Sequence, residues 1–378
     1  HRHLTDHGGG RVRQVVVEPD VALEESYDVL VVSVRWPALT RAFVADVHDR
    51  GRMVLGVFDR EEPAARAHLV AIGVDEALES DQSPQAFIEE FVVLQARRGN
   101  QTPEPDVGVA PPRRGEIIGV GGPPGTGRTE IAIQLGARLG AALIDADDVA
   151  PCIAPRLGLP IEPNLRTAIE AAEHGRGTLD DSIVTPAHVG FPILTGLPNP
   201  GAWSQIRPGE VMRVVERVAR DAGRVVVDGL GHLEDVGSAP RGRNAVARAV
   251  VVESDVVVGV CMASPVGVAR FLAWAVDVHT LAPETPLVVA VNRAPKARFR
   301  RGELFAELTR TIPASAVVFA PDDPHVTDAA WDGRMVAKSP FVRAMTTLAT
   351  AVHQAAQVGA VARAERDADP RPAFEAAS

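Results

Sequence analysis

The segment that most constrains the fold is EIIGVGGPPGTGRTEIAIQ, residues 116 to 134, where a short apolar strand runs into a glycine-rich turn and then a helical pattern. Within it, residues 122 to 129 fit the phosphate-loop pattern G-x-x-x-x-G-K-[ST], except that Arg128 stands in the place of Lys. Glycines allow the backbone to turn its N–H groups toward a phosphate, and the N-terminus of the following helix adds its dipole. The alternative is a tight turn without a ligand, because a planar guanidinium is not a conservative replacement for an ammonium. The segment predicts an α/β fold with a phosphate site.

Three later strands end in polar residues that fit the same kind of site. ALIDAD at residues 142 to 147 ends in an Asp-x-Asp pair, RVVVD at 224 to 228 ends in Asp228, and LVVAVNR at 287 to 293 ends in Asn-Arg. A carboxylate at a strand end beside a phosphate loop can hold Mg²⁺, and Thr129 would supply a hydroxyl. Capping of the following helix is the alternative for each Asp, and a turn is the alternative for the Asn.

Residues 1 to 95 alternate short β-rich runs with helical patterns, which predicts a smaller α/β domain. The expected strands are Gln14–Val17, Val29–Val34, Met53–Phe58 and Glu76–Leu78, and the expected helices are Pro37–Asp49, Pro63–Ile72 and Pro84–Gln95. In outline this domain resembles a response-regulator receiver, which has a flavodoxin-like fold. Ser33, Val34 and Arg35 stand where the phosphoacceptor Asp belongs, and Asp59 and Glu79 or Ser80 replace the later Ser/Thr and Lys. We therefore expect a pseudo-receiver that serves for docking.

Composition fixes the rest of the organisation. Residues 96 to 115 combine Pro, Gly and charge without apolar periodicity and are expected to form a linker, while residues 116 to 366 form the second domain and residues 367 to 378 a disordered tail. No apolar run reaches the roughly 18 residues of a membrane span, and only two cysteines occur, so we expect a cytoplasmic protein. The net charge is -10, of which -8 falls in residues 1 to 95 with 9 Arg against 17 acidic residues. The remaining residues carry only -2, and such a slightly acidic region argues against a surface that coats DNA.

Downstream of the phosphate loop, four motifs in order make the second domain resemble the ParA/MinD P-loop ATPases: the Asp-x-Asp strand, the Asp228 strand, the Asn-Arg strand and PDDPHV at residues 321 to 326. With the receiver-like domain in front, the whole chain resembles the CpaE/TadZ proteins of pilus assembly, secretion and septum-site determination. The resemblance implies ATP and Mg²⁺ as cofactors and a mainly parallel sheet flanked by helices. It assigns Asp147 and Arg128 to catalysis, Thr129 and Asp228 to Mg²⁺, and the nucleotide to Gly122, Gly125, Thr126, Gly127, Arg128, Thr129, Glu130, Asn292, Arg293 and Asp323.

One departure from the family concerns hydrolysis. Pro123 occupies the place of the second Lys of the family's loop, which reaches across the dimer to the partner's nucleotide. The resemblance therefore implies a nucleotide-dependent spatial organiser, a homodimer with slow or absent hydrolysis, that recruits a secretion or pilus ATPase or cell-division proteins to a polar or septal position. We further expect an Arg128→Lys substitution to strengthen nucleotide binding. The alternatives are a nucleotide-free scaffold with a degenerate loop and a chromosome-partitioning ParA-like ATPase.

The roles of two other segments stay open at this point. The basic cluster Arg293, Lys296, Arg298, Arg300 and Arg301 could bind DNA or an acidic partner or form a solvated basic face. Only Phe299 lies among these residues as a stacking platform, so the cluster gives no clear sign of nucleic-acid binding. The periodic segment at residues 341 to 364 is rich in Ala and not basic-amphipathic, so we expect a docking or closing helix and not a direct membrane anchor.

Overall fold

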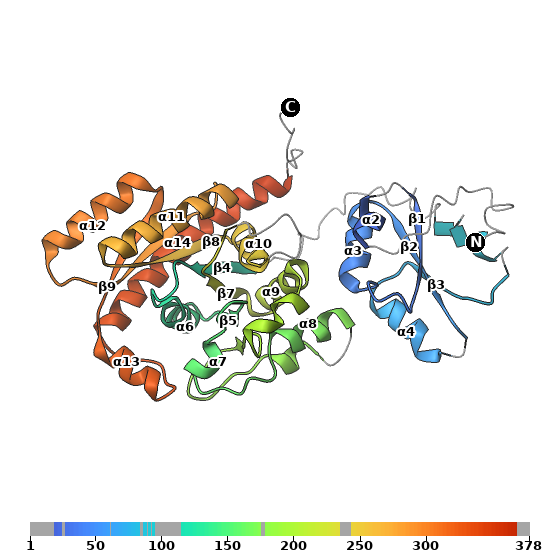
Figure 1. The fold of residues 1–378 in the computed structure, drawn as a ribbon, viewed down its shortest axis with the longest axis horizontal. Coiled ribbons are helices and arrows are strands. Elements are labelled where there is room, and N and C mark those ends of the chain that lie inside the picture. The colour runs from blue at the N-terminus through green and yellow to red at the C-terminus, as the bar shows by residue number, and fades with distance from the viewer. Residues whose placement is uncertain are drawn as a thin grey trace, which may run out of the picture. The chain divides into compact units, whose positions relative to one another are not determined.

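The computed structural model describes residues 19–24, 27–60, 62–83, 86–88, 90–91, 93–94, 115–174, 178–234 and 243–368 of the chain. These residues belong to two compact units, one built on a three-stranded sheet and one on a seven-stranded sheet, and each is described by itself (Figure 1). The strand expected at Gln14–Val17, the linker up to residue 114, the tail from residue 369 and parts of the helix expected at Pro84–Gln95 lie outside the described residues.

The smaller unit contains three parallel strands in the order β1-β2-β3, namely β1 (Val29–Ser33), β2 (Met53–Phe58) and β3 (Glu76–Glu79). Its helices are α2 (Pro19–Glu24), α3 (Arg41–Asp49) and α4 (Pro63–Ala71). Phe43 and Val47 of α3 and Leu69 of α4 are buried in its core. The expected start of α3 at Pro37 is wrong, because Thr40 caps the helix through a 3.1 Å hydrogen bond that its Oγ1 accepts from Phe43 N.

The larger unit is built on a sheet whose seven strands pair in parallel, in the order β10-β9-β8-β4-β7-β5-β6. The strands are β4 (Glu116–Gly121), β5 (Ala142–Asp145), β6 (Ile193–Leu194), β7 (Arg224–Leu230), β8 (Val256–Met262), β9 (Leu287–Ala294) and β10 (Ala314–Pro321). The helices are α6 (Arg128–Leu139), α7 (Ile153–Arg156), α8 (Leu165–His174), α9 (Pro208–Ala222), α10 (Ala245–Glu253), α11 (Pro265–Leu281), α12 (Arg298–Thr311), α13 (Pro324–Trp331) and α14 (Pro340–Ala368), with short 3₁₀ turns at Asp180–Ser182 and Pro200–Gln205.

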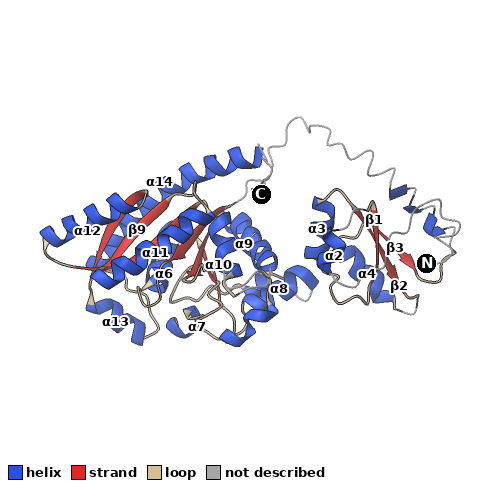
Figure 2. Cartoon of the chain, turned by 45° about the horizontal axis from the view of Figure 1, so that its top comes forward, coloured by secondary structure: helices blue, strands red, loops and turns tan. Residues whose placement is uncertain are grey.

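Helices lie on both sides of this sheet (Figure 2). On one face α6 and α14 pack over the apolar residues Ile118 and Val120 of β4 and Val258 of β8. On the other face α9, α10 and α11 pack against one another and the sheet, and the indole of Trp274 donates a 2.8 Å hydrogen bond to the carbonyl of Leu230. The prediction of a mainly parallel sheet flanked by helices is confirmed.

The strand order locates the functional edge of the sheet. From the central strand β4 the chain adds β5, β6 and β7 on one side and then β8, β9 and β10 on the other. The order therefore reverses beside β4, and ligands of open α/β sheets bind outside the carboxyl ends of the strands at such a point. The phosphate-loop segment and the ends of β5, β7 and β9 all lie at this edge.

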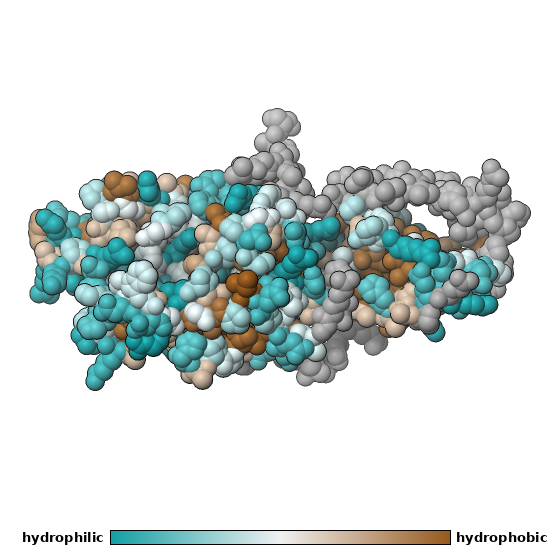
Figure 3. Space-filling model, turned by 60° about the horizontal axis from the view of Figure 1, so that its bottom comes forward, coloured by the Kyte–Doolittle hydropathy of each residue, from teal (hydrophilic) through white to brown (hydrophobic). Residues whose placement is uncertain are grey.

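On the face of the larger unit in Figure 3, hydrophobic residues form small groups separated by hydrophilic ones. Large exposed apolar side chains include Val266, Phe299 and Trp331, on three different helices, and scattered residues of this kind are normal. Within the described residues no helix is both long and apolar enough to cross a bilayer.

Candidate functional site

The loop between β4 and α6 has backbone conformations that require glycine. Gly122, Gly125 and Gly127 have φ of 125°, 79° and 91°. A Cβ at Gly122 would also lie 2.4 Å from the carbonyl oxygen of Val260, and one at Gly127 would lie 2.4 Å from Asn292 Nδ2. All three glycines of the predicted phosphate cradle are therefore needed for the turn, and Gly122 and Gly127 also for its close packing on β8 and β9.

Side-chain hydrogen bonds brace this loop from within and from β9. Thr126 Oγ1 donates to the carbonyl of Pro123 at 2.9 Å, and Asn292 Nδ2 donates to the carbonyl of Thr126 at 2.8 Å. Asn292 Oδ1 accepts from the backbone N–H of Arg293 at 2.9 Å. The amide of Asn292, expected to contact the nucleotide, thus holds the loop in this structure. The Arg293 side chain is largely exposed and lies 3.9 Å from Asp322.

Thr129 and Asp228, the two residues predicted to hold Mg²⁺, are in direct contact. The neighbouring strands β4 and β7 place Val120 opposite Asp228, and Thr129 at the start of α6 donates its hydroxyl to Asp228 Oδ2 at 2.6 Å. Asp228 Oδ1 is buried and has no hydrogen-bond partner among the described residues. Burial raises the pKa of Asp228 to about 6, although the charge of Arg128 and the Thr129 hydrogen bond act in the opposite direction. The pair thus has an oxygen to offer to a further ligand.

Arg128 points at the Asp-x-Asp pair. Its Nη2 lies 3.2 Å from Asp147 Oδ2 in an ion pair whose two side chains are 12% and 8% exposed. The Arg128 Nη1 is buried and has no partner within the described part of the chain. Of the donors of the guanidinium, therefore, one is fixed by Asp147 and another remains for a ligand.

The two carboxylates of the Asp-x-Asp pair also cap the turn that follows β5. Asp147 Oδ1 accepts from the N–H groups of Val149 and Ala150 at 2.9 and 2.7 Å, and Asp145 Oδ2 accepts from those of Cys152 and Ile153, both at 2.9 Å. Burial, followed by the charge of Asp228, raises the pKa of Asp145 to about 7. Capping is thus present for both residues, and the catalytic role of Asp147 stays a prediction.

Two further predicted residues make contacts of their own. Glu130 forms an ion pair with Arg156, whose Nη2 also donates to the carbonyl of Arg334 at 3.0 Å. Asp323 caps α13 and accepts from His325 Nδ1 at 2.8 Å and from the N–H of Phe341 at 3.2 Å. Burial alone would raise the pKa of Asp323. These hydrogen bonds and one from Ser339 outweigh burial and lower the pKa to about 2. Asp323 therefore joins the starts of α13 and α14.

The sequence analysis missed three residues of this site. Asp145 was overlooked because Asp147 was given the role, although the Asp-x-Asp pattern contained both. Cys152 lies with its Sγ 3.1 Å from Thr129 Oγ1, and burial raises the pKa of this thiol to about 12. Gly231 packs against Arg128. The only sequence signal for Gly231 was its place three residues after Asp228, whereas Cys152 had none.

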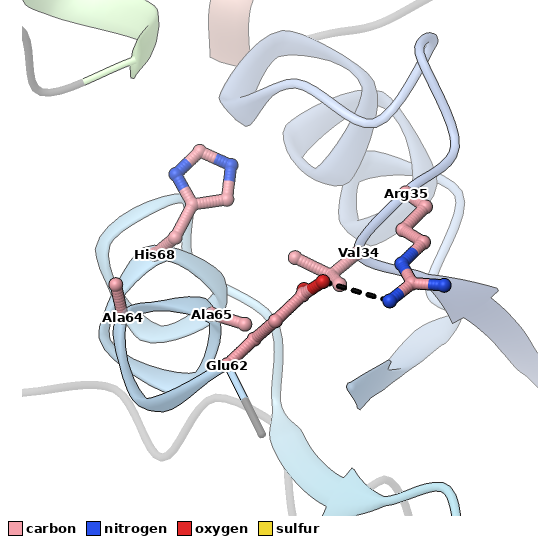
Figure 4. A pocket seen from close by; sticks show the side chains of 6 residues that line it. All are labelled: Val34, Arg35, Glu62, Ala64, Ala65 and His68. Atoms are coloured by element: carbon pink, nitrogen blue, oxygen red, sulfur yellow. Dashed lines mark hydrogen bonds and ion pairs between the residues drawn. The ribbon is translucent and has the colours of Figure 1, made fainter. Parts of the chain in front are cut away.

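In the smaller unit, ion pairs lie just after β1. Arg35, just after β1, pairs with Asp59 and Glu62 at 2.7 Å each, and Ser80 donates to Asp59 at 2.5 Å. The Arg35–Glu62 pair lies at a shallow pocket that Val34, Ala64, Ala65 and His68 also line (Figure 4). No Asp stands at the end of β1, as the sequence indicated.

Comparison with known proteins bears on the larger unit. A scan against protein-family models and a search of curated proteins give no match. Among solved structures, the Pyrococcus furiosus cell division ATPase MinD superposes with a TM-score of 0.50 at 16% identity, over 64% of this chain and 99% of that one. The larger unit has the fold of MinD. The ParA family ATPase of Chlorobium tepidum matches at a TM-score of 0.48, 16% identity, and 62% and 98% coverage. An ATP complex of a McdA variant from Cyanothece matches with a TM-score of 0.49 at 14% identity, over 64% of this chain and 96% of that one.

The match to MinD covers 64% of the chain, which is more than the smaller unit contains, so it must include much of the larger unit. The fold class predicted for the larger unit is therefore confirmed. The receiver-like fold of the smaller unit stays a prediction.

Proposed function

We propose that the larger unit binds ATP together with Mg²⁺. Two buried atoms carry this proposal: the donor Arg128 Nη1 and the acceptor Asp228 Oδ1, neither of which has a partner among the described residues. A buried polar atom without a partner costs about 1–3 kcal/mol. A phosphate oxygen would accept from Arg128 and a hydrated cation would bind Asp228, so a single metal nucleotide would satisfy both atoms.

The charges at the site favour the same ligand. Asp145, Asp147 and Asp228 are buried together at the strand ends, and Arg128 contacts only Asp147 among them through a hydrogen bond. Thr129 and Asp228 would hold Mg²⁺, and the glycine-rich loop would hold the phosphates with its N–H groups. Bound Mg²⁺ would neutralise charge on the phosphate oxygens. The fold shared with MinD, which is described as an ATPase, agrees with this ligand.

Calorimetric titration of the full chain with Mg-ATP tests the proposal. We expect Arg128→Ala to weaken binding by about 10- to 100-fold, since hydrogen bonds to charged groups contribute about 1.5–3 kcal/mol. Arg310→Ala is the matched control, because Arg310 is exposed on α12 and pairs only locally with Glu307. Equal binding by wild type and Arg128→Ala would contradict the assigned role of Arg128.

Hydrolysis should be slow. Pro123 supplies no charge, whereas a cation acting from a second molecule can be worth about 10³ to 10⁵ in rate in phosphoryl transfer. We propose that Asp147 orients the attacking water, but its carboxylate already accepts hydrogen bonds from Arg128 and from two backbone N–H groups. It could act on water only after Arg128 moved to the phosphates.

For the biological role we propose a spatial organiser of the CpaE/TadZ kind, which dimerises on ATP and recruits secretion, pilus or cell-division proteins in the cytoplasm. Support comes from the small parallel unit in front of the ATPase fold. Its order β1-β2-β3 is that of the last three strands in the flavodoxin-like order 2-1-3-4-5. Light scattering tests the dimer: Mg-ATP should move the mass toward twice the chain mass of 40.0 kDa, and an unchanged mass would contradict it.

Two other functions have specific observations in their favour. The internal contacts of Asn292 and Arg128 would also suit a nucleotide-free scaffold, and absence of Mg-ATP binding would select it. Exposed basic residues at the start of α12, Arg298 and Arg300, would suit a ParA-like partitioning ATPase. ATP-dependent binding of duplex DNA that disappears when both are changed to Ala would select that function.

A further inference from the structure

The guanidinium of Arg128 lies directly on Gly231, just after β7. A Cβ at Gly231 would be 1.8 Å from Arg128 Nη1, 2.7 Å from its Cζ and 2.9 Å from its Nη2, and these are the three nearest atoms. Any side chain at position 231 would therefore occupy the space of the guanidinium.

The backbone does not explain this glycine. Gly229, two residues earlier, has a φ of 133°, and a Cβ there would lie 2.4 Å from the backbone N of Asp147. Gly231 has no such φ, and its Cβ would meet no backbone atom among the three nearest. The three atoms that an alanine at position 231 would meet first thus all belong to the end of one flexible side chain.

We propose that Gly231 is a positioning residue for Arg128. Gly231 leaves room for the guanidinium, whose buried Nη1 lies against it, while Asp147 fixes Nη2. Together they hold the guanidinium beside the phosphate loop, from which it would move onto a phosphate of the nucleotide. This inference rests on the proposed binding of Mg-ATP. It makes the phosphate loop one that is built for arginine, with Gly231 providing the room that a planar guanidinium needs and a compact ammonium does not.

The contact between Arg128 and Gly231 argues against a gain in nucleotide binding from an Arg128→Lys substitution. The guanidinium fills the space over Gly231 and reaches Asp147, and a lysine would leave that space unfilled. We now expect Arg128→Lys to weaken Mg-ATP binding by a few-fold.

A double-mutant cycle of Gly231→Ala and Arg128→Lys tests the inference on the full chain, with calorimetry of Mg-ATP binding as the readout. With Arg128 present, Gly231→Ala should weaken binding by about tenfold. In the Arg128→Lys background, the same change should weaken it by less than about twofold, because residues in contact couple. Gly302→Ala is the matched control, since a Cβ there meets nothing within 4 Å, and it should leave the affinity unchanged in both backgrounds.

Urea unfolding without nucleotide gives a second, independent readout of the cycle. Gly→Ala at a permitted φ normally stabilises a protein by restricting the unfolded chain. With Arg128 present, Gly231→Ala should instead destabilise the protein, because the added Cβ would displace the guanidinium. In the Arg128→Lys background it should be neutral or stabilising. This reversal would not follow if Gly231 served only the backbone.

The outcomes separate the inference from the proposed function. Equal effects of Gly231→Ala in both backgrounds, in binding and in unfolding, would overturn the positioning role even if wild type binds Mg-ATP. Failure of wild type to bind Mg-ATP would overturn the proposed function and the move of Arg128 onto a phosphate, while the unfolding cycle still decides whether Gly231 positions Arg128.

Discussion

Replacing Asp228 by Asn should stabilise the protein and at the same time remove the Mg²⁺ dependence of its ATP binding. Burial raises the pKa of Asp228 from 3.8 to about 6. Its stabilising contribution is therefore complete below pH 3.8 and is lost as the pH rises through about 6. Above that pH the buried charge costs about 3 kcal/mol, since one pKa unit corresponds to about 1.4 kcal/mol. Asn removes that cost but weakens the hydrogen bond from Thr129, worth about 1 kcal/mol.

We thus expect Asp228→Asn to gain about 1–2 kcal/mol at pH 8 and nothing near pH 4. Urea unfolding of the full chain at both pH values, without Mg²⁺, measures this gain. Asp221→Asn is the matched control, because Asp221 is exposed and pairs with Arg217 on the surface of α9. In calorimetry the variant should lose at least about tenfold in affinity for Mg-ATP and little for metal-free ATP, since a charged ligand contact contributes about 1.5–3 kcal/mol. Destabilisation of the variant at pH 8 would contradict the cost assigned to the buried charge. Equal losses of ATP affinity with and without Mg²⁺ would contradict the role of Asp228 in binding the metal.

Three further results are expected. Wild-type protein should release phosphate from ATP at about 10⁻² s⁻¹ or more slowly, the range of phosphoryl transfer without a trans-acting cation, and several turnovers per second would show that another residue replaces the missing charge at Pro123. Asp323→Asn should destabilise the protein by about 1–2 kcal/mol at pH 7, and the loss should disappear as the pH falls toward 2, because hydrogen bonds hold the pKa of Asp323 at about 2. Urea unfolding across this pH range measures it, and a loss that is independent of pH would contradict the assignment. Acetyl phosphate should add no phosphate to residues 1 to 95 by mass spectrometry, because Ser33 and Arg35 stand at the acceptor position.

The larger fold was predictable because each motif lies on an element with a strong local signal. An apolar strand, a glycine-rich turn and a helix pattern define β4, the loop and α6, and a parallel sheet then brings the ends of β5, β7 and β9 to the same edge. For this reason the contact between Thr129 and Asp228 could be anticipated across 99 residues of sequence. Strand ends were less predictable: β5 stops at Asp145, so that Asp145 is its last residue and Asp147 lies in the turn after it.

The functions of single side chains at the site were less predictable, because they depend on packing between distant segments. Nothing local shows that the amide of Asn292 braces Thr126 or that Gly231 makes room for Arg128. From the sequence, Arg128 was interpreted as a poor substitute for Lys. In the structure its guanidinium lies between the carboxylate of Asp147 and Gly231. The start of α3 was misplaced for a local reason, since the preference of Pro for the first helical turn was weighted above the capping residue Thr40.

The proposed site depends above all on the binding of ATP by the wild-type chain. Equilibrium dialysis with labelled ATP in the presence of Mg²⁺, and in parallel with a chelator, measures both the stoichiometry and the contribution of the metal. We expect one ATP bound per chain, at least about tenfold more tightly with Mg²⁺, because the metal would satisfy the buried Asp228 Oδ1 while a phosphate would satisfy Arg128 Nη1. No bound ATP under either condition, or binding that Mg²⁺ does not strengthen, would contradict the proposed site.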